Sequence, residues 1–169
     1  LTLPQIHAAM PGYLAFARQR RLPMAATAAL DSDEAVIRVL EGLIAQGVAR
    51  SHAAGKQSVF GIAPEQHLAA AYYRNTIVHY FLASAIAELA LLGAAEHASA
   101  DRIGAFETEA LGIRDLLKFD FFFRDRAQFV AGVESEADTL APQWREQLAS
   151  GPDGVASLLG AAPMLCSDM

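Results

Sequence analysis

The residues of this chain best suited to acid–base chemistry are its five histidines: His7, His52, His67, His79 and His97. A histidine acts as a general base when a carboxylate holds its ring in position. His97 comes closest to that arrangement, because Asp101 follows it with three residues between them. We expect Asp101 to lie in the first turn of a helix instead, where the helix dipole favours a carboxylate. The sequence therefore predicts no catalytic residue.

Nucleophilic and metal chemistry have equally little support in the sequence. The single cysteine, Cys166, lies three residues from the end of the chain with no histidine near it, and chain ends are commonly mobile. One cysteine cannot form an internal disulfide. The cysteine and the histidines also lack the spacing of a zinc site, so we expect no metal and no cofactor.

A short polar cluster is the best candidate for binding or docking. Tyr73, Arg74 and Asn75 come just before an almost wholly apolar segment, and His79 follows within it. Arg74 and Asn75 could contact a phosphate or an acyl donor held by a neighbouring domain. Alternatively, Arg74 is buried and paired with an acidic residue, while Asn75 and His79 satisfy backbone groups and fix how the helix docks. Both interpretations remain open.

Composition limits the classes of protein to which the chain can belong. Hydrophobic residues make up 53% of the chain and charged residues 19%, which excludes a disordered segment and favours a piece of something larger. The net charge of −6 argues against a nucleic-acid partner, because such binding depends on basic patches.

The N-terminal part predicts two helices and a hairpin. The first helix covers Pro4 to Arg21, with a kink or a start near Pro11. Asp31 and Glu34 resemble a capping box for the second helix, which ends at Gly47. Residues 48–52 and 57–62 flank Ala54-Gly55-Lys56, which indicates a two-stranded hairpin with a glycine turn. This order indicates a winged-helix-like unit over residues 1–63.

The middle of the chain predicts one long helix at the centre of a bundle. Pro64 suits the first helical position, and nothing breaks the pattern before Gly93, which allows about thirty residues or 45 Å. Its second half is apolar on nearly every side. We do not expect Thr76 to Ala95 to cross a membrane, because it contains His79 and Glu88.

The remaining segments predict further helices around that axis. One runs from about Ala100 to Phe119, a second carries Phe129, Val133 and Leu140, and a third covers Trp144 to Ala149. Phe121 to Phe123 form a connector that is either a membrane-facing wedge or part of core and interdomain packing. We therefore predict a mainly α fold, with a helical bundle over 64–150 and a flexible or truncated tail over 151–169.

Two blocks of sequence resemble a known family. Tyr72-Tyr73-Arg74-Asn75 with His79, at the head of a long apolar helix, and Leu116 to Phe123 further on, are similar to the C-terminal region of bacterial glycerol-3-phosphate acyltransferases, particularly those of actinobacteria. The resemblance covers roughly residues 25–129.

The resemblance implies acyl transfer from acyl-CoA or acyl carrier protein to glycerol 3-phosphate, a step of phospholipid biosynthesis, at the cytoplasmic face of the cell membrane with peripheral membrane contact. The family's base is a histidine separated from an aspartate by four residues. In this chain the residues at that spacing are Gly12, Gln57, Tyr72, Ser84 and Arg102. We therefore expect the chain alone to be inactive and its partner to be an upstream acyltransferase domain that holds the substrates.

A second class of function stays open beside this one. The order of helices and hairpin also suits a free-standing winged-helix-type interaction or regulatory module. A reading frame that continues upstream into a histidine, four residues and an aspartate would favour the acyltransferase.

Overall fold

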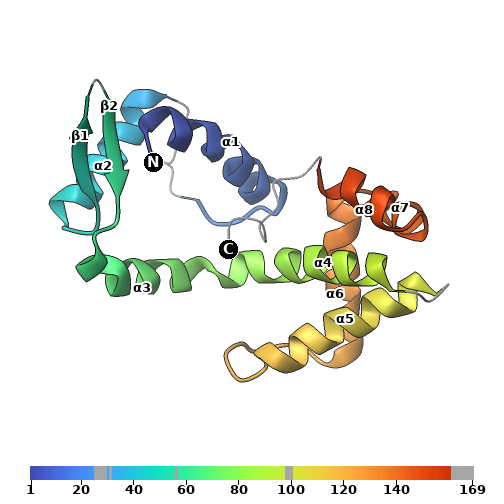
Figure 1. The fold of residues 1–169 in the computed structure, drawn as a ribbon. Helices are drawn as coiled ribbons and strands as arrows, with labels where there is room; N and C mark the ends of the chain where they lie inside the picture. Colours follow the sequence, from blue (N-terminus) through green and yellow to red (C-terminus); the bar gives the residue numbers. More distant parts are fainter. Residues whose placement is uncertain (25–29, 31, 56, 98–100, 161–169) are drawn as a thin grey trace. The chain divides into compact units, whose positions relative to one another are not determined.

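The computed structural model of the protein describes residues 1–24, 30, 32–55, 57–97 and 101–160. These residues form helices and one two-stranded antiparallel hairpin, which confirms the mainly α prediction (Figure 1). The chain divides into two compact units, Leu1–Ile77 and Val78–Met169. The division after Ile77 differs from the boundary at residue 63 predicted from sequence. Whether residues 1–63 form a separate domain stays a prediction.

The first unit begins with helices α1 (Leu3–Gln19) and α2 (Asp33–Ala45). Gln5 caps α1 by accepting a hydrogen bond from the backbone N–H of Thr2 at 2.8 Å. The predicted start near Pro11 is wrong, because α1 starts eight residues earlier and continues through this proline. Ser32 caps α2 by accepting from the backbone N–H of Ala35 at 3.2 Å. The cap thus differs from the predicted Asp31, which lies outside the described residues.

Strands β1 (Arg50–Ala54) and β2 (Gln57–Gly61) confirm the predicted hairpin. Arg50 pairs with Gly61 and Ala54 with Gln57, so the turn is two residues long. Gly55 has a φ of 66° there, a conformation that glycine adopts without steric cost. The N-terminus adds to this hairpin, since the backbone N–H of Phe60 donates to the carbonyl of Leu1 at 2.8 Å.

The predicted thirty-residue helix is interrupted. A 3-10 turn, η1 (Pro64–Gln66), leads into α3 (His67–Ile77), and α4 (His79–Glu96) follows after Val78. Thr76, Ile77 and Val78 are all β-branched, which lowers helix propensity. The Thr76 hydroxyl also donates to the carbonyl of Tyr73 at 2.6 Å, the acceptor that the N–H of Ile77 would use in a regular helix. A single continuous helix was therefore a wrong prediction.

Helix α4 forms the centre of the second unit, as the sequence predicts. Nine of its residues are buried, and it packs against α5 (Arg102–Leu117), α6 (Arg126–Leu140), α7 (Trp144–Ala149) and α8 (Pro152–Leu159). In Figure 1 α5 runs back along α4 and α6 passes behind it. Trp144 is completely buried, its ring lies 4.8 Å from that of Phe106, and its indole N–H donates to Asp138 at 2.8 Å.

Helix α8 lies within the segment predicted as a tail. Residues 151–169 were expected to be flexible or truncated, yet 152–159 form a helix whose Val155, Leu158 and Leu159 belong to the same buried core as Trp144. Gly151, with a φ of 84°, makes the tight turn that brings α8 back onto α7. Residues 161–169, with Cys166, lie outside the described part of the chain.

Among the described residues, no single helix is both long and apolar enough to cross a membrane. The two helical segments Pro64–Ile77 and His79–Glu96 meet the length and composition criteria only as a bent pair.

Candidate docking surface

The four predicted binding or docking residues fall in different units. Tyr73, Arg74 and Asn75 lie on α3 in the first unit, whereas His79 begins α4 in the second. All four are exposed. The ring of His79 contacts that of Tyr80, with the ring centres 4.0 Å apart, and it borders a cavity of the second unit. The structure thus brings Tyr73, Arg74 and Asn75 together on one helix and leaves His79 on another.

The interpretation of Arg74 as a buried, acid-paired residue is wrong for this chain. Arg74 is exposed, and within the described residues its guanidinium donates only to the side-chain oxygen of Asn75, at 3.4 Å. The reason is that α3 has no buried residue at all, so no core is available to enclose the charge.

Helix α3 presents large apolar side chains to the surroundings. Leu68 is 85% exposed, Tyr72 69%, Tyr73 51% and Ile77 49%; we call these four residues the α3 apolar set. Leu68 and Tyr72 are four residues apart and share one side of the helix, as do Tyr73 and Ile77. Tyr73 is five positions after Leu68, which turns the second pair by about 140° from the first. The helix is therefore apolar on more than one side.

An isolated helix of this length is not expected to be stable. Helices shorter than about 12 to 15 residues are marginal in water, and most helices in proteins depend on tertiary packing. Each leucine or isoleucine side chain that moves from water into a packed interface contributes about 1.5 to 3 kcal/mol. The α3 apolar set therefore resembles a surface that packs against another protein domain.

The structure places one histidine beside an aspartate that sequence spacing does not predict. The Nδ1 atom of His7 lies 2.6 Å from an Asp33 oxygen, joining α1 to α2. This is the pairing of a general base with its orienting carboxylate. However, the two side chains are 39% and 57% exposed, and the groove beside them is otherwise lined by Pro4, Ala8 and Pro11, which offer no side-chain donor for an oxyanion. We assign the pair to helix packing.

Asp101 lies at the start of a helix, as predicted, but at the N-cap and not within the first turn. It is the N-cap of α5, where its carboxylate accepts from the backbone N–H of Gly104 at 2.9 Å. A carboxylate committed to a cap satisfies one of the free donors of a helix end. His97 ends α4, so the two residues belong to the ends of neighbouring helices.

One perturbed carboxyl lies in the first unit. The pKa of Glu34 is held below its ordinary value by a hydrogen bond from its own backbone N–H, followed by one from Ser32 and by the charge of Arg38. These are the interactions of an acidic residue in the first turn of a helix. In the described ranges no group of three or more histidine, cysteine, aspartate or glutamate side chains could hold a metal ion.

Comparisons with known proteins agree with the resemblance in the sequence. A family model described as the glycerol-3-phosphate acyltransferase C-terminal region matches residues 1–161. The chain is 37% identical over 138 residues to a protein named putative acyltransferase plsB1 from Mycobacterium bovis, and to proteins of the same name from two strains of Mycobacterium tuberculosis. Each alignment covers 80% of this chain and 22% of the relative. No solved structure matches.

Proposed function

The chain belongs to the family of glycerol-3-phosphate acyltransferase C-terminal regions, and from that premise we propose that it is a non-catalytic segment whose helix α3 docks onto the acyltransferase domain of the same polypeptide. The observation that carries this proposal is the α3 apolar set, on a helix with no buried residue. The chain spans 22% of the length of its mycobacterial relatives, so a larger body is available to cover the helix.

The reaction belongs to the rest of the polypeptide under this proposal. The upstream domain transfers an acyl group from acyl-CoA or acyl carrier protein to glycerol 3-phosphate, at the cytoplasmic face of the membrane. No histidine of the chain has four residues between it and a following aspartate, which supports a division of labour in which this segment stabilises and positions the catalytic domain. Tyr73, Arg74 and Asn75 then meet that domain at the α3 surface.

A free-standing regulatory module is the less supported class. The family match extends over residues 1–161, which includes the first unit and its hairpin. Helix α2 would serve as the recognition helix of a winged-helix protein, but it carries Asp33, Glu34 and Glu41 against one Arg38, and such a face repels phosphate.

Hydrogen exchange on α3 tests the docking proposal directly. We expect the amides of residues 67–77 to exchange at least tenfold more slowly in the full-length enzyme than in the 169-residue chain, because docking removes the helix from water. Amides of α5, which are packed in both, serve as the internal reference. Equal exchange of α3 in the two proteins would contradict the proposal.

A matched pair of substitutions identifies the surface. Ile77 on α3 and Ile62 before η1 are both 49% exposed and both lie in the first unit. In the full-length enzyme Ile77→Asp should lower the melting temperature and the acyl transfer rate, because it places a charge in the docked surface. Ile62→Asp should change neither. Equal effects of the two substitutions would show that α3 has no special role.

A further inference from the structure

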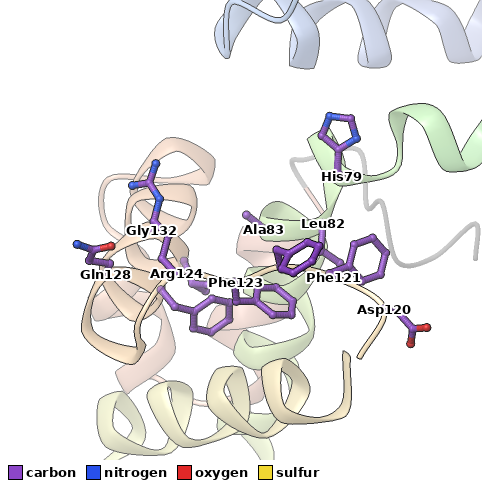
Figure 2. A pocket seen from close by; sticks show the side chains of 12 residues that line it. His79, Leu82, Ala83, Asp120, Phe121, Phe123, Arg124, Gln128 and Gly132 are labelled. Carbon is purple, nitrogen blue, oxygen red and sulfur yellow. The ribbon is translucent and has the colours of Figure 1, made fainter. Parts of the chain in front are cut away.

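A cavity in the second unit stands apart from the α3 surface. It has a volume of about 540 Å³ and lies between the start of α4, the aromatic turn formed by residues 120–124, and α6. This volume falls within the range of about 300 to 1,000 Å³ that is usual for small-molecule sites. We call it the aromatic pocket; Figure 2 shows its lining.

The walls of the aromatic pocket are mostly apolar. They consist of Leu82, Ala83, Phe121, Phe122, Phe123, Phe129 and Val133. Phe122 borders the pocket and is nevertheless fully exposed. An apolar side chain in that position gains nothing from the fold itself, and it gains free energy only when something apolar occupies the neighbouring space.

The pocket is preformed because its aromatic turn is tied down from outside. The rings of Phe123 and Phe129 meet edge to face at 5.2 Å, and the guanidinium of Arg114 lies within 6 Å of both rings. Arg114 also donates to the carbonyl of Arg124 at 3.0 Å, while Asp115 accepts from Arg126 at 3.1 Å. A rigid apolar site loses little free energy to ordering when it binds a ligand.

The protein leaves the space beside Gly132 empty. A Cβ atom built on Gly132 meets no other atom within 4 Å, although this glycine lines the pocket from the middle of α6. A glycine inside a helix is less favourable than an alanine. Its presence at an open wall therefore fits a pocket whose volume is left for a ligand.

The polar groups of the pocket lie at its edges. Arg124 is exposed and forms no ion pair with any acidic side chain in the described part of the chain. Gln128 and His79 also border the cavity. In Figure 2 Asp120 lies on the side away from Arg124 and points outward. The charge available at the Arg124 edge is therefore positive.

We propose that the aromatic pocket binds one long acyl chain of an amphiphile that has an anionic head, with the chain between the phenylalanines and the head against Arg124. The apolar walls offer few hydrogen-bonding groups to a compact polar molecule, whereas an extended hydrocarbon chain needs none. The guanidinium supplies paired N–H donors that match a phosphate or carboxylate. The site goes beyond the docking role and does not depend on it.

Calorimetric titration of the 169-residue chain with alkyl phosphates below their micelle concentrations tests the site. We expect dodecyl phosphate to bind, and decyl phosphate to bind at least fivefold more weakly, because each buried methylene is worth up to about fourfold in affinity. Arg124→Gln should lower the affinity for dodecyl phosphate at least fivefold and leave the affinity for the neutral dodecyl maltoside unchanged. Affinities independent of chain length would overturn the proposal.

Two glycine substitutions provide the decisive comparison. Gly132→Leu fills the pocket, whereas Gly112→Leu adds the same side chain at an exposed position of α5 that also has no atom within 4 Å of its Cβ. Both should keep the helical circular dichroism and the melting temperature. Only Gly132→Leu should abolish dodecyl phosphate binding; equal binding by both variants would overturn the proposal.

Vesicles of phosphatidylcholine and phosphatidylglycerol distinguish the sources of the chain. If the chain floats with the vesicles, and Gly132→Leu weakens both this flotation and dodecyl phosphate binding, the pocket takes its acyl chain from a bilayer. If the parent chain binds dodecyl phosphate but does not float with the vesicles, the pocket takes free amphiphiles. Flotation without any dodecyl phosphate binding would overturn the pocket in favour of a membrane-inserting turn.

Discussion

At the scale of single residues, exposure decides what each candidate side chain can do. Arg74 and Asn75 keep their polar groups in water and touch mainly each other. A charge in water contributes little to the stability of its own fold. The same charge becomes important only when another domain covers it, so the role of Arg74 has to be measured in two proteins.

Arg74→Ala should leave the 169-residue chain unaffected. We expect its free energy of unfolding to change by less than about 0.5 kcal/mol, as is usual for exposed positions. In the full-length enzyme the docking proposal predicts that the same substitution lowers the melting temperature and leaves the KM for glycerol 3-phosphate unchanged. Urea unfolding, thermal melting and steady-state kinetics provide the three measurements.

An unchanged melting temperature with a KM raised tenfold or more would give Arg74 a different role. That pattern corresponds to about 1.4 kcal/mol of lost binding and would mean direct recognition of the phosphate.

At the scale of elements, the helices differ in how much they depend on others. Helices α4 to α8 share one buried core, whereas α3 contributes no residue to any core. The break at Val78 separates these two kinds of helix. Because the preceding β-branched run weakens the helix at this point, the exposed α3 and the buried α4 are not one rigid rod.

Helix α8 should be essential to the second unit. Leu158 is 3% exposed, so Leu158→Ala should lower the free energy of unfolding by about 2 to 5 kcal/mol through lost burial and a residual cavity. Leu116→Ala, at a leucine that is 77% exposed, should cost less than about 0.5 kcal/mol. Chemical denaturation of both variants checks the prediction, and two neutral substitutions would restore the interpretation of residues 152–159 as a tail.

At the scale of the whole molecule, the chain corresponds to the C-terminal region of its family. It spans 22% of its mycobacterial relatives and carries no histidine at the family's spacing from an aspartate. The His7 and Asp33 pair joins two helices in an exposed groove. Stabilisation and positioning of a catalytic domain are functions that such a part can perform without a base.

The purified 169-residue chain should therefore show no acyl transfer. We expect no lysophosphatidate from glycerol 3-phosphate and palmitoyl-CoA, because no histidine of the chain stands at the family's spacing from an aspartate. Radiolabelled glycerol 3-phosphate detects the product, and the full-length enzyme is the positive control. Turnover proportional to the amount of chain, and abolished by His7→Gln, would assign a catalytic role to the His7 and Asp33 pair.

The sequence by itself determined the family, the mainly α class, the hairpin about Gly55, the place of Asp101 at the start of a helix and the central position of residues 79–96. Each follows from a pattern of neighbouring residues: a hydrophobic period, a turn glycine, a carboxylate near a helix start, or a motif shared with relatives. Such patterns extend over only a few residues, so they can be recognised from the amino-acid sequence alone.

Only the tertiary structure decided the exposure of Arg74, the contact of His7 with Asp33, the burial of α8 and the empty space beside Gly132. Each of these depends on which distant segments meet, and on whether side chains from several helices fill the space between them. Leu158 and Leu116 illustrate the difference, since both lie in helices and only Leu158 reaches the core. Local sequence patterns do not specify that choice, because burial is a property of the packed unit.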